Sequence, residues 1–336
     1  MKRLSYVAQT TFLLLGTVIG SGFLSGREIV SFFGKNIFFY TPFAGVLFFF
    51  TTYILLTLGG KYGSLEEGNR ALFGRAEKTV NAALGVCLFS VVAASLAMID
   101  SMVNSLLGID GRIPAASLVT LGAAVFFAKK GIGGVKKLNA VLVPAMLAVT
   151  LAFLFARGRF DFGAPLYPSR SGAGRVCFYV GFNMFLSAAV IARAGSTDKK
   201  SVFWVSLFTA AVSFALILLI YGAVNYEGAN AAGEDLPLAY LFSKSPAQKI
   251  AFGIVLYLGA LTTAVCSWFP LTETCKRLGG FWNIAFPAGA FALSRFGVKF
   301  IVGRVYPAAG VLGAAYFAFA FAAEAYKKRK KGKIKE

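Results

Sequence analysis

The chain has 336 residues, of which 57% are hydrophobic and 14% are charged, and its formal net charge is +20. Soluble domains usually contain about 25% charged residues, and apolar runs of about 20 residues, enough to cross a bilayer as a helix, recur along this whole sequence. These features exclude a soluble enzyme and predict an integral membrane protein that crosses the bilayer many times.

The positive charge does not indicate a nucleic-acid partner. Lys and Arg lie in short loops between the apolar runs and in the tail 327–335, and basic residues near helix ends keep a loop on the cytoplasmic side. A basic tail also suits contact with anionic lipid. We therefore expect the lipid bilayer as a partner and no nucleic acid.

Ten spans are predicted, with two amphipathic stretches at 64–75 and 233–243 between them. The spans cover residues 6–33, 37–60, 79–107, 113–129, 136–156, 174–193, 201–224, 247–271, 280–296 and 300–324.

The distribution of basic residues predicts the orientation. With the N-terminus inside, 22 of the 34 basic residues fall on the cytoplasmic side, so both termini are expected in the cytoplasm. The segment 157–175 opposes this pattern, because it places four arginines outside. We expect one transporter domain over 1–325, with repeats at 6–156 and 174–324 and a basic tail at 326–336.

Catalytic chemistry is not expected. The sequence has no His, and its four Cys residues show no metal-ligand spacing. No convincing pair of acids, Ser/Lys pair or metal cluster lies within a span. The sequence predicts a protein that is not an enzyme, with no catalytic residues, no cofactor and no metal site beyond the coupling ion considered below.

The first span contains a dense glycine run. Gly16, Gly20, Gly22 and Gly26 fall within eleven residues, and each costs a helix about 1 kcal/mol relative to Ala. We predict a break near 19–22. A break leaves carbonyls free at the end of the inner half-helix, near Val18, and N–H groups free at the start of the outer one. Carbonyls can bind a cation and N–H groups an anion.

The sixth span contains Gly181-Phe182-Asn183, and Gly181 follows Gly20 by 161 positions, close to half the chain. Interrupted spans at matching places in two halves indicate a transporter site at the bilayer midplane. We predict a second break near 181–183, with the two halves inverted because each has five spans. Small residues four apart also allow two helices to pack closely, and this alternative remains open.

Other polar residues in the spans are weaker candidates. Thr262 and Thr263 in span eight offer adjacent hydroxyls to a hard cation, although Thr often bonds the carbonyl one turn back. Arg27, Glu28 and Asp100 are candidate gate residues near the outer ends of their spans. Each could equally be a charge at the membrane interface.

The glycine run resembles the opening of the YkvI-like bacterial membrane proteins of the amino acid–polyamine–organocation superfamily. The matching stretches are 16–23, 25–29 and 32–34. The likeness continues through 131–144, 178–191 and 258–264 to Tyr306-Pro307. It implies the LeuT fold: an all-α membrane protein of about ten helices in two inverted five-helix repeats, with helices 1 and 6 broken.

The resemblance to LeuT-type symporters also implies site residues. A sodium ion would be bound by Gly16, Ile19, Gly259, Thr262 and Thr263. The solute would contact Gly20, Ser21, Gly22, Phe23, Phe182 and Asn183, with its carboxylate at the amides of the first-span break.

Departures from the family pattern affect these expectations. Phe23 stands where some symporters have a polar side chain that helps to hold a second sodium, so one sodium is expected. No Lys occurs from 138 to 156, where some proton-coupled relatives have one, which favours sodium over protons.

These observations predict cation-coupled transport of a small zwitterion, an amino acid above all, by alternating access. The alternative is a membrane sensor or regulatory subunit that keeps the pocket without transporting. The sequence leaves the solute, the transport direction and the oligomeric state open.

Overall fold

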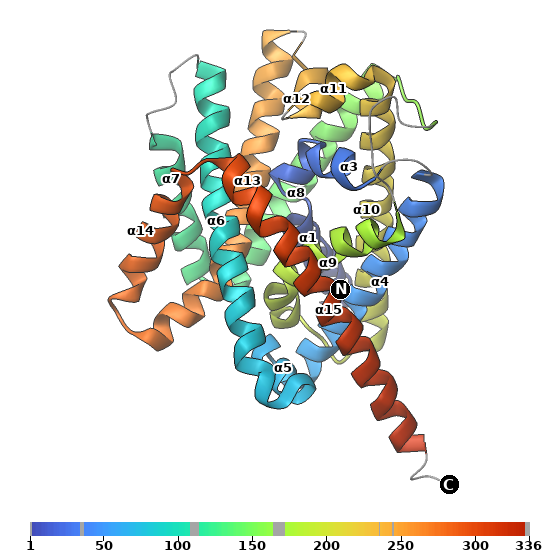
Figure 1. Ribbon diagram of the computed structural model, residues 1–336, viewed down its shortest axis with the longest axis vertical. Helices are drawn as coiled ribbons and strands as arrows, with labels where there is room; N and C mark the ends of the chain where they lie inside the picture. The colour runs from blue at the N-terminus through green and yellow to red at the C-terminus, as the bar shows by residue number, and fades with distance from the viewer. Residues whose placement is uncertain are drawn as a thin grey trace.

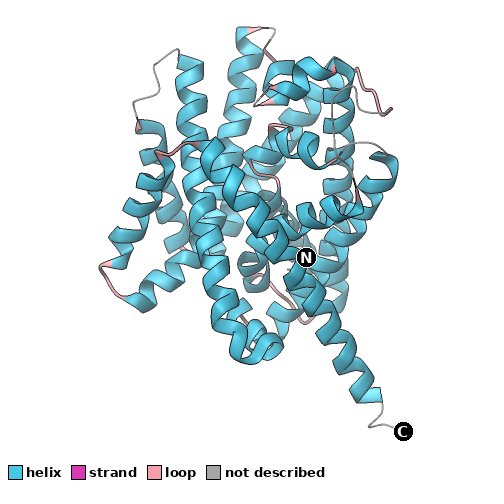
Figure 2. Cartoon of the chain, viewed as in Figure 1, coloured by secondary structure: helices cyan, strands magenta, loops and turns pink. Residues whose placement is uncertain are grey.

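The computed structural model describes residues 2–33, 37–107, 114–163, 172–234, 236–243 and 245–332, and every regular element within them is helical (Figures 1 and 2). The helices are α1 (Lys2–Val18), α2 (Ser21–Leu24), α3 (Arg27–Phe32), α4 (Ile37–Tyr62), α5 (Leu65–Phe73), the 3₁₀ turn η1 (Gly74–Ala76), α6 (Glu77–Leu107), α7 (Ala115–Lys129), α8 (Gly131–Arg157), α9 (Ala173–Arg193), α10 (Lys199–Glu227), α11 (Ala229–Gly233), α12 (Pro237–Leu241), α13 (Pro246–Leu278), α14 (Trp282–Ser294) and α15 (Val298–Gly332).

The predicted all-helical membrane fold is confirmed. Seven helices of the described chain are long and apolar enough to cross a membrane. The shorter helices α7 and α14 and the interrupted series α1–α3 take the places of the remaining predicted spans. The two amphipathic stretches form α5 with η1 and α11 with α12, and α15 continues as a helix into the basic tail as far as Gly332.

The short helices begin and end at residues suited to these positions. Ser64 caps α5 by accepting a hydrogen bond from the N–H of Glu67. Ser245 caps α13 in the same way for Gln248, and Pro246 occupies the first helical position. Gly74 ends α5 with a φ of 56°, a left-handed value that glycine adopts without strain.

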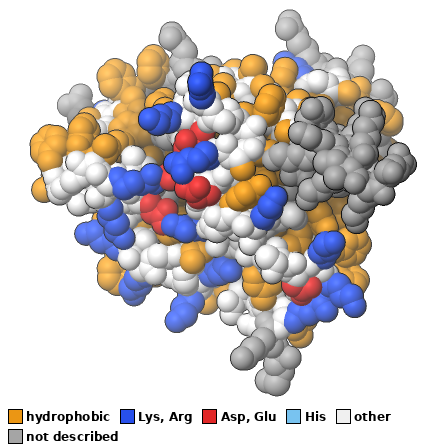
Figure 3. Space-filling view, turned by 90° about the horizontal axis from the view of Figure 1, so that it is seen from below, with side chains coloured by type: hydrophobic (Ala, Val, Ile, Leu, Met, Phe, Trp, Pro, Cys, Tyr) orange, Lys and Arg blue, Asp and Glu red, His pale blue; other side chains and the backbone are white. Residues whose placement is uncertain are grey.

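The outer surface is strongly apolar. Large hydrophobic side chains exposed on it include Phe38, Phe39, Val86, Val119, Val141 and Ile284. An apolar surface of this extent requires a nonaqueous environment, and helices satisfy their own backbone hydrogen bonds within a bilayer. Seen from the end that carries α5, basic side chains surround a few acidic ones (Figure 3).

The first predicted helix break is confirmed. Helix α1 ends at Val18 and α2 begins at Ser21, so the chain leaves helical geometry at Ile19 and Gly20. A second interruption follows at Gly26, which has a φ of 80° and separates α2 from α3. The glycine run therefore produces two turns in one span.

The second predicted break, at 181–183, is wrong. Helix α9 is continuous from Ala173 to Arg193. Its glycine serves close packing instead: a Cβ added at Gly181 would lie 2.7 Å from the backbone nitrogen of Ala314 in α15. Gly313 meets the backbone of Gly181 from the other side. The small-residue packing alternative therefore applies to α9.

Candidate solute and ion site

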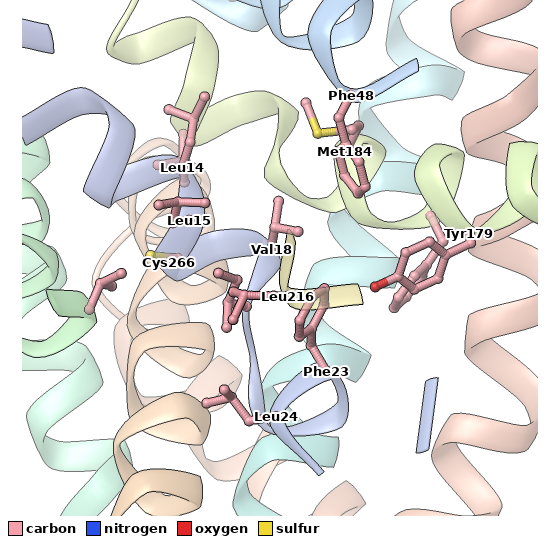
Figure 4. Packing of buried hydrophobic residues seen from close by; sticks show 14 of the residues in the cluster. Leu14, Leu15, Val18, Phe23, Leu24, Phe48, Tyr179, Met184, Leu216 and Cys266 are labelled. Atoms are coloured by element: carbon pink, nitrogen blue, oxygen red, sulfur yellow. The ribbon is translucent and has the colours of Figure 1, made fainter. Parts of the chain in front are cut away.

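The break between α1 and α2 leaves backbone carbonyls without helical partners. The N–H of Ile19 donates to the carbonyl of Leu15 over 2.6 Å, and the next recorded bond of this kind runs from Leu24 to Gly20 over 2.9 Å. The last carbonyls of a helix have no partner within it. Those at the end of α1, Gly16 among them, therefore face the break. Figure 4 shows Val18, Phe23 and Leu24 on the successive pieces of chain around it.

A central cavity of about 40 Å³ lies beside this break. It is lined by the break itself and by residues of α1, α2, α3, α6, α9, α13 and α15, among them Thr17, Gly20, Gly22, Glu28, Ser95, Met98, Phe182, Asn183, Ser187, Thr263, Ser267 and Tyr306. A water molecule needs about 10–15 Å³ of such space. The cavity as it stands has room for a few waters but not for an amino acid.

Thr262 and Thr263 lie on α13 opposite the break. Both hydroxyls donate to the carbonyl of Gly259, over 3.0 Å and 2.9 Å. The alternative that each Thr bonds a carbonyl one turn back is therefore correct for the hydroxyl hydrogens. Their oxygen lone pairs remain available for another interaction. A side chain at Gly20 would overlap the Thr263 hydroxyl, which places that oxygen directly against the break.

Asn139 of α8 completes the surroundings of α1. Its Nδ2 donates to the carbonyl of Val135 over 2.8 Å and to the sulfur of Cys266 over 3.4 Å. Its Oδ1 is buried without a hydrogen-bond partner and lies against Gly16. An oxygen that accepts nothing at this depth is a polar group suited to a cation.

The α9 residues expected at the solute site do line the cavity. Phe182 contacts Tyr306, with ring centroids 4.3 Å apart. Asn183 is held in place, because its Nδ2 donates to the carbonyl of Tyr179 over 3.0 Å. Ser187 donates to the carbonyl of Asn183 over 2.8 Å.

The side chain of Phe23 is fully buried in the hydrophobic core beside Val18 and Leu216 and does not line the cavity (Figure 4). The turn at α2 directs this ring into the core, and the expected contact of the solute carboxylate with the backbone N–H of Phe23 stays a prediction. The side chain of Ser21 lies outside the described part of the chain.

A larger outer cavity of about 640 Å³ adjoins the central one toward α12. Its lining includes Arg27, Ser31, Phe32, Ser101, Met102, Glu234, Leu236, Tyr240, Lys249 and Phe252. Four residues line both cavities and mark the passage between them: Gly22, Glu28, Met98 and Tyr306.

The three candidate gate residues have different surroundings. Glu28 is 9% exposed and lies at that passage. Arg27 lines the outer cavity and donates to the carbonyls of Ala232 and Glu234, each over 3.3 Å.

Asp100 lies apart from both cavities. It forms an ion pair with Arg295 and accepts a hydrogen bond from the N–H of Ser117 over 2.9 Å, at the start of α7. These contacts give it a structural role between α6, α7 and the end of α14.

The opposite end of the molecule is held by ion pairs. Arg193 at the end of α9 pairs with Glu273 of α13 over 2.7 Å. Arg277, also on α13, pairs with Glu66 of α5. The larger cavity thus lies toward α12, and ion pairs join the helices at the α5 end.

Local sequence does not identify Tyr306, Met98 or Ser187 as lining residues. Tyr306 falls within the family likeness, but nothing in its neighbouring sequence indicates a cavity. These residues reach the site because α6 and α15 pass beside α9 in the folded chain.

Comparison with known proteins agrees with this geometry. No family model matches the chain. The sequence is 24% identical over 337 residues to the membrane protein YkvI of Bacillus subtilis (strain 168), with 92% of this chain and 93% of that protein covered.

Solved transporters share the fold. MhsT, solved in complex with L-phenylalanine, gives a TM-score of 0.67 at 15% identity, over 96% of this chain and 91% of MhsT. A Na⁺-coupled sialic acid symporter gives 0.56 at 14%, over 95% and 75%. Mhp1, a nucleobase-cation-symport-1 family transporter with bromovinylhydantoin bound, gives 0.53 at 16%, over 93% and 78%. The chain is therefore a YkvI-like membrane protein with the LeuT-type fold.

Proposed function

We propose that this YkvI-like protein is a secondary transporter that moves a small zwitterionic solute, an amino acid above all, together with Na⁺ by alternating access. The observation that carries the proposal is the break in α1 at Ile19 and Gly20, with the Thr263 hydroxyl against it and a cavity beside it. Broken helices at depth are tolerated where they line a cavity, and they form the binding sites of many transporters.

Two cavities in series support transport rather than a buried ligand site. A solute would enter the outer cavity near α12, pass Glu28 and Tyr306, and reach the central cavity. The ion pairs of Arg193 and Arg277 would have to separate for release at the α5 end. Both pairs are substantially exposed, and such pairs contribute about 0.2–1 kcal/mol each. They are weak enough to open and close during a cycle.

Sodium fits the oxygen atoms near the break. Hard cations prefer carbonyl, hydroxyl and amide oxygens. The carbonyls at the end of α1 and of Gly259, with the hydroxyls of Thr262 and Thr263, supply such groups. Asn139 Oδ1 adds an acceptor beside Gly16. The sialic acid symporter that shares this fold is Na⁺-coupled, which supports the same assignment.

The α5 end is proposed to face the cytoplasm. Basic side chains gather there (Figure 3), and cytoplasmic loops carry an excess of Lys and Arg. With this orientation the outer cavity opens to the cell exterior, and both termini are cytoplasmic.

Uptake into proteoliposomes tests the function. Each of the twenty amino acids, radiolabelled, is offered with an inward Na⁺ gradient and again with K⁺ replacing Na⁺. Uptake of at least one amino acid that needs Na⁺ is expected. Equal uptake in both salts would refute the sodium assignment. Saturable binding without uptake would instead identify the sensor or regulatory subunit.

A further inference from the structure

The Glu28 carboxylate has no partner that explains its burial. It is 9% exposed, its Oε2 is buried without a hydrogen-bond partner, and it forms no ion pair with any Lys or Arg in the described ranges. Its other oxygen, Oε1, lies against Gly22, where any side chain would displace it. Burying an unpaired charge costs several kcal/mol. The burial of Glu28 at this cost suggests that its carboxylate has a function.

A second unsatisfied group lies nearby. The hydroxyl of Tyr179 on α9 is also buried without a hydrogen-bond partner. Tyr306 lines both cavities together with Glu28. In Figure 4 the Tyr179 oxygen points toward the side where Val18 and Phe23 lie. Glu28 of α3 and Tyr306 of α15 line the passage between the two cavities, whereas Tyr179 packs behind it against Phe32 and Phe33.

The ionisable group at this place is an acid. Among the described residues that line the central cavity, Glu28 alone is charged. The arginine next to it in sequence is already engaged, because Arg27 donates to the carbonyls of Ala232 and Glu234. The outer cavity also contains Glu234 and Lys249, which are exposed. A positive group entering from the outer cavity would find Glu28 as its first buried counter-charge.

We propose that Glu28 binds the protonated amino group of the solute, so that the protein selects solutes with an ammonium group. This inference rests on the proposed solute-binding function and adds the chemical class that the site recognises. An ammonium has three N–H donors, enough to satisfy the unpaired Oε2 of Glu28.

Charge balance then relates the solute to the sodium ion. A zwitterion brings no net charge, so Glu28 and one Na⁺ compensate each other when both are present. The ammonium lies toward Glu28 and the carboxylate toward the α1 break. A carboxylate close to Gly22 would face Glu28 at short range and be repelled. The solute carboxylate is therefore directed to the Gly20 and Thr263 side of the cavity.

Matched probes test the inference in the purified full-length protein. Three skeletons are each used as amine, zwitterion and acid: methylamine, glycine and acetate; isobutylamine, L-valine and isovalerate; phenethylamine, L-phenylalanine and 3-phenylpropionate. Binding is measured by thermal stabilisation in detergent with Na⁺ present. At least one zwitterion or amine is expected to bind, and its deaminated acid at least about tenfold more weakly.

The variant Glu28→Gln keeps the size of the side chain and removes its charge. Affinity for the bound amine or zwitterion should fall at least about tenfold. Glu234→Gln is the matched control, because it makes the same change in the outer cavity and should leave affinity unchanged. Glu28→Asp, which keeps the charge on a shorter side chain, should lie between the two. Its affinity remains informative if Glu28→Gln does not fold.

Three results would overturn the inference: equal binding of the acids, undiminished affinity in Glu28→Gln, or failure of every amine and zwitterion to bind the wild type. Undiminished solute affinity in Glu28→Gln together with a lost pH dependence of uptake would assign Glu28 to proton transfer instead. Glu28-dependent binding without proteoliposome uptake would leave this inference standing and remove the transport proposal.

Discussion

The hydroxyl oxygen of Thr263 lies directly against Gly20, so closely that the glycine cannot carry a side chain without displacing it. This contact joins the break in α1 to the middle of α13. It places a side-chain oxygen at the point where the backbone carbonyls of α1 lose their helical partners. The glycine is therefore needed for this close approach.

Replacing Gly20 tests that contact. In Gly20→Ala the new methyl group would push Thr263 away from the break, and Na⁺-dependent uptake should fall at least about tenfold. The control is Gly122→Ala on α7, where an added Cβ meets nothing within 4 Å. Uptake by the control should match the wild type. Normal uptake by Gly20→Ala would contradict the close approach.

The sodium ligands give a second prediction. Thr262→Val with Thr263→Val removes two hydroxyls and keeps the side-chain shape, so apparent Na⁺ affinity should fall at least about tenfold, or about 1.4 kcal/mol. Solute binding at saturating Na⁺ should change much less. Thr272→Val on the same helix is the control, because Thr272 also donates only to the carbonyl one turn back, that of Trp268 over 3.1 Å. A changed thermal stability with unchanged Na⁺ dependence would support helix packing instead.

The packing of α9 on α15 gives a third prediction. A Cβ at Gly181 meets backbone atoms of Gly313 and Ala314, which cannot rotate away. Gly181→Ala should therefore lower the unfolding free energy by about 1–3 kcal/mol, as overpacking usually does. Thermal unfolding in detergent measures the effect. Gly85→Ala on α6 has open space around it, and it should unfold at or slightly above the wild-type temperature because Ala favours a helix by about 1 kcal/mol over Gly.

The ion pairs at the α5 end give a fourth prediction. Glu66→Gln with Glu273→Gln should favour opening at that end, because two exposed pairs together contribute about 1 kcal/mol, or about fivefold in population. Cys275, buried on α13 between Glu273 and Arg277, reports on this opening. In a background with the other three cysteines changed to Ala, its alkylation by a maleimide should accelerate about fivefold.

The control for this experiment is Glu67→Gln. It removes an equally exposed pair with Arg70, over 3.2 Å, that lies within α5 alone. Alkylation of Cys275 should keep its original rate in this variant. An equal acceleration in both variants would mean that surface charge, rather than the link between helices, sets the rate.

The break in α1 could be predicted because four glycines in eleven residues give this stretch a low helix propensity. The false break in α9 arose because Gly181 carries the same local signal as a break. Whether a glycine marks a helix break or a close helix contact depends here on Gly313 and Ala314. These residues lie far along the chain and contact Gly181 only in the folded protein.

The same limit applies to charged residues. Asp100 and Glu28 are both acids near the outer ends of predicted spans. Arg295, 195 positions away, pairs with Asp100, whereas Glu28 has no such partner in the described chain. Local sequence gives residue type and depth, but it does not show which distant side chain neutralises a charge.

The small central cavity also affects the kinetics of capture. With about 40 Å³ of space, a solute can enter only when the Phe182 and Tyr306 rings, 4.3 Å apart, move from their present places. The association rate is then limited by ring motion rather than by diffusion, and it should saturate with solute concentration. The same rings can return behind the solute, so that entry and enclosure become a single step.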